Sequence, residues 1–363
     1  MTASRLDSSM LEVNDLRKYF PVRQSLVDAV RRIAPKPIKA VDGVSFSLAR
    51  GEVLALVGES GCGKTTIAKT LIGLEEQTDG DIRFEGQTVG AHERRQRAAL
   101  VPLEGSGPGT REQLVFPKIA MKRLRQQAQM IFQDPYESLN PRATIFDIVA
   151  EPLVVHGIAK PRQERVARVK SALEDAGLRP AEDYTLRFPH ELSGGQRQRV
   201  VIAGAMVLQP ELLIADEPVS MLDVSIRADI LNLLRGLRDS RGISILFITH
   251  DLGTVAYFAD RIAVMYLGRI VEIGATNDVL KNPQHPYTRA LLSVVPVPNP
   301  RLRRERIILQ GETPNPIDVP PGCRFHPRCP VAIEPCRQID PLFAEVTQGH
   351  QAACLLVPQR AHS

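Results

Sequence analysis

The order of apolar and polar positions predicts two kinds of β-strand along this chain. Between residues 10 and 50, apolar and polar side chains alternate, which is typical of short antiparallel strands with one buried face. The apolar positions of this pattern are Leu11, Val13, Leu16, Val44, Phe46 and Leu48. Three other stretches, Val53 to Val57, Leu212 to Ala215 and Ile245 to Ile248, are apolar throughout. Because they alternate with helical patterns, they predict an α/β fold with a parallel sheet.

Helices and loops are predicted around these strands. A helix is expected from about Lys64 to Leu74, directly after a glycine-rich turn, and residues 138–190 also look helical. Residues 91–128 are basic around a run of glycines, which predicts a surface loop with a solvated flank. From Pro283 the composition shifts. Ten of the 28 prolines fall within residues 296–335, so a separate, loop-rich C-terminal module is expected.

Composition narrows the class of protein further. At roughly 150 residues per domain, 363 residues correspond to about two domains, and 43% hydrophobic with 24% charged residues is ordinary for a globular chain. The net charge, 46 − 41 = +5, is mildly basic, so no nucleic-acid partner is expected. No run approaches the roughly 18 apolar residues of a spanning helix, and the first nine residues carry no apolar leader segment. A cytoplasmic protein is therefore expected.

A phosphate-binding motif follows the first uninterrupted strand. Residues 58–65 read GESGCGKT, which fits G-x-x-x-x-G-K-[ST], and they lie between a predicted strand and a predicted helix as this motif requires. Glycines let backbone N–H groups surround phosphate oxygens, Lys64 reaches the β and γ phosphates, and the Thr65 hydroxyl ligates Mg²⁺. A chance glycine-rich turn is the alternative, and the flanking strand and helix count against it.

Two acids end the second uninterrupted strand. Asp216 and Glu217 directly follow Leu212 to Ala215, at the edge of the sheet where the phosphate loop is expected. Asp216 is expected to hold Mg²⁺ through its water shell, and Glu217 to orient or deprotonate an attacking water. Taken alone the pattern is weak, because an acid that caps a helix looks the same.

A further motif carries a family resemblance. Residues 192–196 read LSGGQ, end 20 residues before Asp216, and resemble the signature motif of ATP-binding-cassette (ABC) ATPases. The motif also has a physical rationale. Ser193 can cap the helix predicted from Gly195 to Leu208, and the two glycines of the motif leave backbone N–H groups accessible to an anion. A simple capped helix start is the alternative.

The family's remaining motifs follow in its usual order. Gln133 resembles the Q-loop, residues 220–223 (SMLD) resemble the D-loop, and His250 resembles the switch histidine that senses the γ-phosphate. Phe20 stands where the family places an adenine-stacking aromatic, although Tyr19 beside it could do the same. A lone histidine at such a position is more often structural, so the motifs are informative only together.

The resemblance implies three sets of site residues. The implied catalytic residues are Glu217, His250 and Gln133. The implied nucleotide contacts are Phe20, Gly58, Ser60, Gly61, Cys62, Gly63, Lys64, Thr65, Thr66, Gln133, Ser193, Gly194, Gly195, Gln196, Asp216 and Asp223. The implied Mg²⁺ ligands are Thr65, Gln133 and Asp216.

Within this family the chain resembles the ATP-binding subunits of dipeptide and oligopeptide importers. The likeness rests on residues 58–64, 133–142, 266–269 and 285–292 and on the tail from Pro320 to Cys354. It implies an ABC-type P-loop fold, α/β with an antiparallel β subdomain, a helical signature subdomain and a small loop-rich C-terminal extension. The implied bounds are 10–275 for the ATPase domain, about 138–205 for its helical subdomain, and 276–363 for the extension.

The same resemblance implies a function and partners. ATP hydrolysis would power import of dipeptides or oligopeptides from the cytoplasmic face of the membrane. The implied partners are a second, homologous ATPase subunit in a head-to-tail dimer, two transmembrane permease subunits, and a periplasmic or extracellular peptide-binding protein. Three alternatives stay open: another cargo such as nickel or glutathione, a soluble ABC ATPase acting on nucleic acid or ribosomes, and a non-catalytic module that senses redox state.

Four of the five cysteines cluster in the tail. Cys323, Cys329, Cys336 and Cys354 lie in one 32-residue span with the spacing C-x5-C-x6-C-x17-C. Four thiols in a reducing compartment suggest a metal site before disulfides, although the tight cysteine pair typical of zinc is absent. By resemblance a [4Fe–4S] cluster is expected first and zinc second, with four free thiols as the remaining possibility.

Overall fold

The structure is a computed structural model that describes residues 9–22, 36–89, 118–295 and 306–358. Its contacts divide the chain into two compact units. Unit 1 takes in residues 1–11, 47–53 and 83–248, and unit 2 takes in residues 12–46, 54–82 and 249–363. No helix among the described residues is long and apolar enough to cross a membrane.

Unit 1 contains a parallel sheet with the strand order β8-β7-β6. Its strands are β6 (Ala128–Ile131), β7 (Leu212–Asp216) and β8 (Ser244–Thr249). Ile131 pairs with Ala215, and Asp216 pairs with Ile248. Every residue of β7 and β8 is buried, which confirms the prediction from their uninterrupted apolar pattern. Because the strands are parallel, their carboxyl ends meet at one edge of the sheet.

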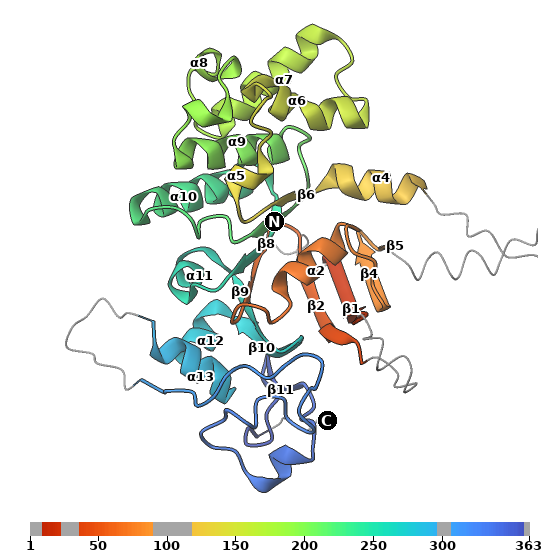
Figure 1. Cartoon of the computed structure of the whole chain (residues 1–363), viewed down its shortest axis with the longest axis vertical. Helices are drawn as coiled ribbons and strands as arrows, with labels where there is room; N and C mark the ends of the chain where they lie inside the picture. Colours follow the sequence, from red (N-terminus) through yellow and green to blue (C-terminus); the bar gives the residue numbers. More distant parts are fainter. Residues whose placement is uncertain (1–8, 23–35, 90–117, 296–305, 359–363) are drawn as a thin grey trace, which may run out of the picture. The chain divides into compact units, whose positions relative to one another are not determined.

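Helices make up most of the rest of unit 1 (Figure 1). They are α4 (Lys118–Gln127), α5 (Pro135–Ser138), α6 (Ile145–His156), α7 (Arg162–Asp175), α8 (Glu182–Thr185), η1 (Pro189–Glu191), α9 (Gly194–Met206) and α10 (Val224–Arg241). The helices α6, α7 and α9 pack on one another through buried side chains such as Val149, Val169 and Val200. The prediction of a helical segment at residues 138–190 is confirmed.

One prediction for unit 1 is wrong. Residues 91–128 were expected to form a surface loop, but residues 118–127 form α4 and Ala128 begins β6. The basic residues of this stretch are good helix formers, and Leu124 is a buried anchor among them. The strong local charge concealed both features. Residues 91–117 lie outside the described part of the chain.

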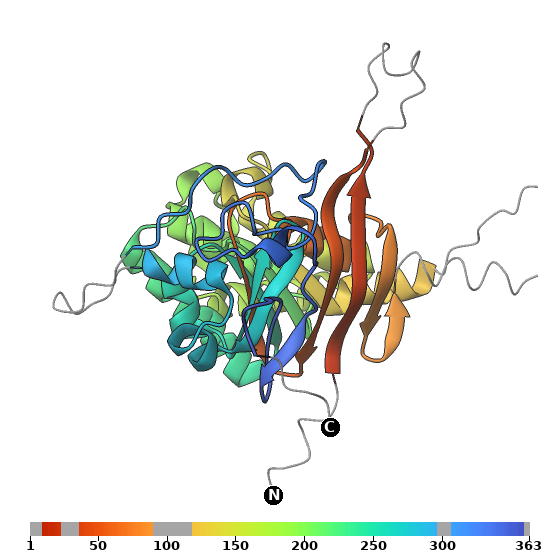
Figure 2. The same cartoon turned by 90° about the horizontal axis from the view of Figure 1, so that it is seen from below.

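Unit 2 contains most of an antiparallel sheet near the start of the chain. Strands β1 (Ser9–Phe20), β2 (Ile38–Ala49) and β4 (Asp79–Phe84) lie in the order β2-β1-β4, and β5 (Gln87–Val89) follows along the chain. Figure 2 shows β1 and β2 side by side along their length. Leu11, Val13 and Leu16 are buried, whereas Asn14 and Asp15 are exposed. The alternation predicted for a half-buried strand holds in β2, where Val44, Phe46 and Leu48 are buried, but in β1 it shifts by one residue at Asp15, whose φ is 47°.

A second sheet of unit 2 extends into the tail. Its strands are β3 (Val53–Val57), β9 (Arg261–Tyr266), β10 (Arg269–Ala275), β12 (His350–Ala352) and β11 (Ala344–Thr347), in the order β11-β12-β10-β9-β3. Strands β3 and β9 are parallel, and the pairs β9–β10 and β10–β12 are antiparallel. Because Glu272 of β10 pairs with Ala352 of β12, the tail and the preceding strands share one sheet.

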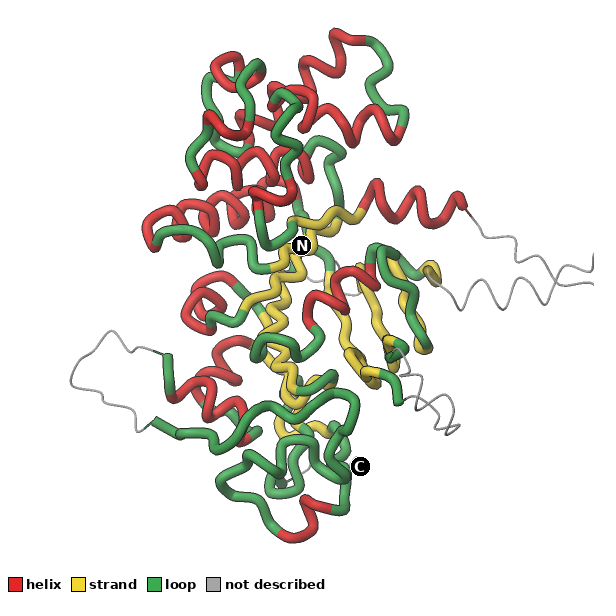
Figure 3. The backbone as a smooth tube through the Cα atoms, viewed as in Figure 1, coloured by secondary structure: helices red, strands yellow, loops and turns green. Residues whose placement is uncertain are grey.

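Short helices and loops complete unit 2. The helices are α2 (Lys64–Leu71), α11 (Leu252–Phe258), α12 (Thr276–Lys281), α13 (Pro286–Ser293) and η2 (Glu334–Arg337). The tail, residues 306–358, is mostly loop, as the proline content predicted (Figure 3).

The tail has a small core that it shares with the rest of unit 2. Phe325 is 1% exposed, and its ring centroid lies 5.2 Å from that of Tyr266 and 5.3 Å from that of Tyr287. Glu272, fully buried, accepts hydrogen bonds from the Gln284 and His285 N–H groups at 2.7 and 2.9 Å, and pairs with His350 Nε2 at 2.7 Å. Aromatic packing and a satisfied buried carboxylate therefore attach the tail to unit 2.

Candidate ATP-hydrolysis site

The phosphate loop connects β3 to α2 in unit 2. At two of its glycines the backbone lies too close to neighbouring strands for any side chain. A Cβ on Gly58 would lie 2.2 Å from the Met265 carbonyl oxygen, and one on Gly63, where φ is 109°, would lie 2.2 Å from the Ala40 carbonyl oxygen. Gly61 has φ of 78° and nothing within 4 Å of its Cβ position. The loop is thus closed against β2 and β9 on one side and open at Gly61.

The lysine of this loop is folded inward. Lys64 is buried, and its Nζ donates to the Gly58 carbonyl at 2.8 Å and to the Glu59 carbonyl at 2.9 Å. Lys64 begins helix α2. The first turn of this helix carries no acidic side chain, so the positive end of the helix dipole is not neutralised there. These groups fit a polyphosphate, which would accept the Lys64 hydrogen bonds in place of the two carbonyls.

The other loop residues differ in exposure. Ser60 and Thr65 are exposed and Thr66 is half-buried. Cys62 is buried, its Sγ lies 3.7 Å from Lys64 Nζ, and burial raises the pKa of its thiol. The thiol of Cys62 is therefore buried beside Lys64, and the nucleotide contact implied for this residue stays a prediction.

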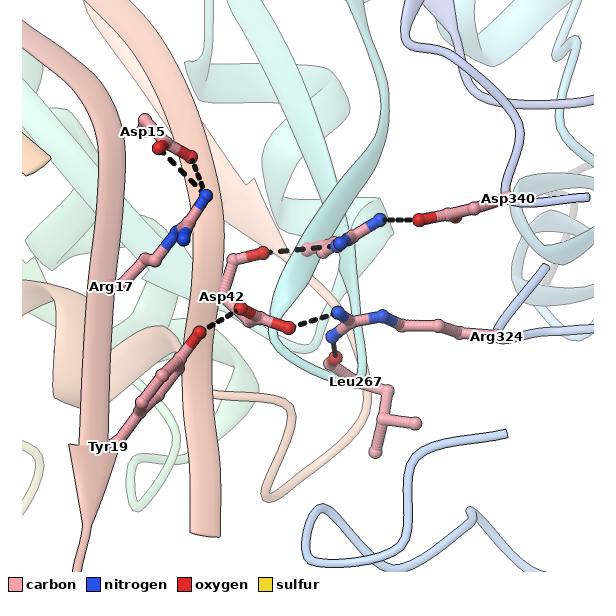
Figure 4. A network of polar contacts seen from close by, with 8 residues as sticks. Asp15, Arg17, Tyr19, Asp42, Leu267, Arg324 and Asp340 are labelled. Atoms are coloured by element: carbon pink, nitrogen blue, oxygen red, sulfur yellow. Dashed lines mark hydrogen bonds and ion pairs between the residues drawn. The ribbon is translucent and has the colours of Figure 1, made fainter. Parts of the chain in front are cut away.

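The two aromatic candidates for adenine stacking point to opposite faces of β1. Lys18 Nζ lies 4.6 Å from the centroid of the Phe20 ring and 2.9 Å from Glu75, which follows α2 closely in the chain. The Tyr19 hydroxyl donates instead to Asp42 (Figure 4). Burial and this hydrogen bond raise the pKa of Tyr19 to about 12. Phe20 therefore lies on the face shared with Lys18 and Glu75, whereas Tyr19 faces Asp42.

In unit 1, two of the implied catalytic residues, Gln133 and Glu217, lie close together. Asp216 ends β7 and is 2% exposed, and Glu217 follows it. Glu217 has φ of 47°, a left-handed conformation that is strained for a residue with a side chain, and its N–H donates to the Ile248 carbonyl at 2.9 Å. Gln133 Nε2 lies 3.4 Å from Glu217 Oε2. His250 directly follows β8 and is exposed.

The signature segment begins α9 as expected from its residues. Ser193 Oγ accepts from the Gln196 N–H at 3.3 Å, and Gln196 Oε1 accepts from the Ser193 N–H at 3.0 Å. This reciprocal capping box confirms Ser193 as the N-cap. A Cβ on Gly195 would lie 2.8 Å from Ile226 of α10, whereas one on Gly194 would have no neighbour nearer than 3.8 Å.

The D-loop segment is attached to the catalytic strand. Ser220 donates to the Glu217 carbonyl from its N–H at 3.2 Å and from its hydroxyl at 3.0 Å. Asp223 is the N-cap residue of α10, and its side chain is exposed. The turn that presents Asp223 thus starts from the backbone of Glu217.

The expectation of an iron–sulfur cluster or zinc at the tail cysteines is wrong. Within residues 306–358 and the other described parts, no group of three or more His, Cys, Asp or Glu side chains is arranged to hold a metal ion. Cys323, Cys329, Cys336 and Cys354 are free thiols. Burial raises the pKa of Cys323 to about 11 and also raises the pKa of Cys329 and Cys354. Burial therefore favours neutral thiols, whereas a metal needs thiolates.

Sequence reasoning missed the residues that hold the phosphate loop from the tail side. The Glu59 N–H donates to the Tyr287 hydroxyl at 3.0 Å, and the Glu59 carboxylate accepts from Arg328 at 2.8 Å. These partners stand 228 and 269 positions away in the chain. No local pattern could have predicted such contacts.

Comparisons with known proteins agree with this site. The ABC transporter family profile matches residues 41–220, and that of the oligopeptide/dipeptide transporter C-terminal region matches residues 271–336. Fold and site define an ABC-type ATPase. The chain belongs to the family of oligopeptide and dipeptide ABC transporter ATP-binding proteins.

Individual relatives match over nearly their whole length. The oligopeptide transport ATP-binding protein AppF of Bacillus subtilis is 45% identical over 98% of this chain and 99% of its own. The dipeptide transport ATP-binding protein DppF of Haemophilus influenzae is 45% identical over 96% of this chain and 97% of its own. Neither name mentions an iron–sulfur cluster.

Solved structures share the fold. The cbiO1 protein of Clostridium perfringens, part of the ABC transporter complex cbiONQ, has a TM-score of 0.58 and 27% identity, covering 76% of this chain and 92% of its own. The dimeric ABC transporter cassette MJ0796 has the same TM-score at 24% identity, covering 74% of this chain and 99% of its own, and shows the fold alone.

Proposed function

We propose that this chain hydrolyses ATP to power import of dipeptides or oligopeptides by an ABC transporter. The observation that carries the hydrolytic part is the contact between Gln133 and Glu217, at 3.4 Å, beside a strained Glu217 backbone. The peptide cargo is supported by the names of AppF and DppF, which match over nearly the full chain.

Each site residue has a proposed role in hydrolysis. The phosphate loop binds the ATP phosphates, with Lys64 donating to them after it leaves the Gly58 and Glu59 carbonyls. Phe20 stacks on adenine. Glu217 takes a proton from the attacking water, and Gln133 orients that water. His250 is proposed to donate to the γ-phosphate.

Mg²⁺ is the proposed metal of this reaction. Thr65, Asp216 and Gln133 offer a hydroxyl, a carboxylate and an amide oxygen, which are the oxygen ligands that Mg²⁺ prefers. The ion supplies positive charge to the β and γ phosphate oxygens. Asp216 is buried and so is suited to hold a bound water or the ion in one position.

The proposed assembly follows the family. The signature residues Ser193, Gly194, Gly195 and Gln196, with Asp223, would contact the nucleotide bound by a homologous second ATPase subunit in a head-to-tail dimer. Two transmembrane permease subunits would hold this dimer at the cytoplasmic face of the membrane, with a periplasmic or extracellular peptide-binding protein on the other side. Residues 10–275 would act as the ATPase domain, with the helical subdomain at about 138–205, and residues 276–363 as the extension.

An uptake assay tests this function and its cargo. Cells lacking this chain receive either the wild type or Lys64→Ala, and uptake of a labelled dipeptide, a labelled hexapeptide, nickel and glutathione is measured. We expect the wild type alone to restore peptide uptake. Restoration of nickel or glutathione uptake instead would show that the proposed cargo is wrong, and equal uptake with Lys64→Ala would overturn the role of the phosphate loop.

A further inference from the structure

One short segment of the tail, residues 323–329, contacts the rest of unit 2 at two separate points near the phosphate loop and the end of β1. Two arginines four positions apart make these contacts. The Arg324 side chain is 8% exposed and that of Arg328 is 10% exposed. Arginine is rarely buried to this extent unless it is paired, so the partners show what each side chain does.

The first point of contact is the phosphate loop. Arg328 Nη1 lies 2.8 Å from Glu59 Oε2, and Arg328 Nη2 lies 3.3 Å from Glu59 Oε1. Thr313 Oγ1 donates to the same carboxylate at 2.7 Å. The Glu59 N–H is held by Tyr287 at 3.0 Å, and the Glu59 carbonyl accepts from Lys64 at 2.9 Å. The side chain, N–H and carbonyl of this loop residue are therefore all fixed, and two of these three groups are fixed from outside the loop.

The second point of contact is Asp42 of β2, beside the end of β1 (Figure 4). Arg324 Nη1 donates to the Leu267 carbonyl at 2.7 Å, and Arg324 Nη2 pairs with Asp42. The other oxygen of Asp42 accepts from the Tyr19 hydroxyl. Burial alone would raise the pKa of Asp42, but these hydrogen bonds outweigh it and lower the pKa, so the carboxylate stays charged. Tyr19 immediately precedes Phe20.

We infer that Arg324 and Arg328 are positioning residues for ATP. Arg328 holds the phosphate loop through Glu59, and Arg324 holds the end of β1, and with it Phe20, through Asp42 and Tyr19. A bidentate guanidinium–carboxylate pair fixes direction as well as distance, which a phosphate cradle requires. This inference rests on the proposed function, because it assumes phosphates in the loop and adenine on Phe20. The tail is then part of the nucleotide site.

The two arginines can be distinguished by ligand. Calorimetric titration of the purified full chain compares ATP with inorganic tripolyphosphate, which has no adenine. Arg328→Gln should weaken binding of both ligands by about 10- to 100-fold, the loss typical when a residue that orients a metal ligand is changed. Arg324→Gln should weaken ATP binding similarly but leave tripolyphosphate within about twofold. Arg337→Gln is the matched tail control, because its pair with Glu334 is 68% and 75% exposed, and it should change neither affinity.

A second variant covers the possibility that Arg328→Gln fails to fold. Glu59→Gln removes the loop side of the same pair, so it should reproduce the losses of Arg328→Gln, and the double variant should lose little more. Fully additive losses would overturn the pairing. Wild-type affinity for both ligands in Arg324→Gln and Arg328→Gln would overturn the inference, as would equal loss of both ligands in Arg324→Gln. Failure of the wild type itself to bind ATP would instead refute the proposed function.

Discussion

Replacing Phe325 with alanine should make the tail detach more often from the rest of unit 2. The ring is 1% exposed and packs against Tyr266 and Tyr287, with a third ring contact to His285 at 5.6 Å between centroids. Alanine would remove all three contacts and leave a cavity in the core that the tail shares with β9 and α13.

The size of the effect follows from this burial. Phe to Ala changes in well-packed cores cost about 3–5 kcal/mol, because the lost transfer free energy adds to the cost of the cavity. At about 1.4 kcal/mol per tenfold change, the equilibrium between attached and released tail shifts by roughly 100- to 4,000-fold. The ion pairs of Arg324 and Arg328 remain, so the tail should open more often but should not detach permanently. Unit 1 does not contain this core, so it should stay folded.

Amide hydrogen exchange of the native protein measures this opening directly. Amides of residues 323–329 should exchange faster by about the same factor in Phe325→Ala, while those of β7 should keep their protection. Leu342→Ala is the control, because this tail side chain is 76% exposed and its loss should change stability by no more than about 0.5 kcal/mol. Unchanged exchange of residues 323–329 in Phe325→Ala would refute the shared core.

Three further outcomes are expected. Glu217→Gln should lower ATP turnover by at least about 100-fold while ATP still binds, because the general base is lost and the phosphate loop is intact; turnover near wild type removes Glu217 from this role. Gly194→Leu has space for its Cβ, so it should leave the ATP affinity of the isolated chain unchanged yet abolish turnover in the transporter. A loss of affinity as large as that of Lys64→Ala contradicts the head-to-tail arrangement. Burial lowers the pKa of His285 to about 4, so its stability contribution is complete above about pH 6.5 and is lost as pH falls towards 4, by up to about 3 kcal/mol. Urea unfolding of His285→Asn, which keeps an acceptor for the Tyr287 N–H, should depend less on pH over this range, and an unchanged pH dependence counts against the assignment.

Features that are local in the chain could be predicted. The uninterrupted strands, the phosphate loop between β3 and α2, and the capping box of Ser193 each depend on residues within a few positions of one another. Their periodicity and spacing are visible in the sequence for that reason. Helix α4 was missed although it is local, because its charge resembled a solvated loop.

The contacts of the tail could not be predicted, because its partners are distant in the chain. Asp42 and Arg324 stand 282 positions apart, and Glu59 and Arg328 stand 269 apart. The clustering of cysteines was visible, but their burial was not, and burial raises the pKa of Cys323, Cys329 and Cys354. A pattern of metal-ligating residue types therefore led to the wrong chemistry.

Three acids outside the tail hold it against the rest of unit 2. A loop-rich segment of this length has little apolar surface for a core of its own, so other groups must hold it. Asp42, Glu59 and Glu272 each lie outside the tail, and each takes its partner from within it, namely Arg324, Arg328 and His350. Removing Asp42 or Arg324 would leave its partner's charge buried without its counter-charge, which costs more than the pair itself contributes. The tail and the phosphate-loop side of unit 2 therefore depend on each other, and the three pairs do the work that a metal cluster does in other small loop-rich modules.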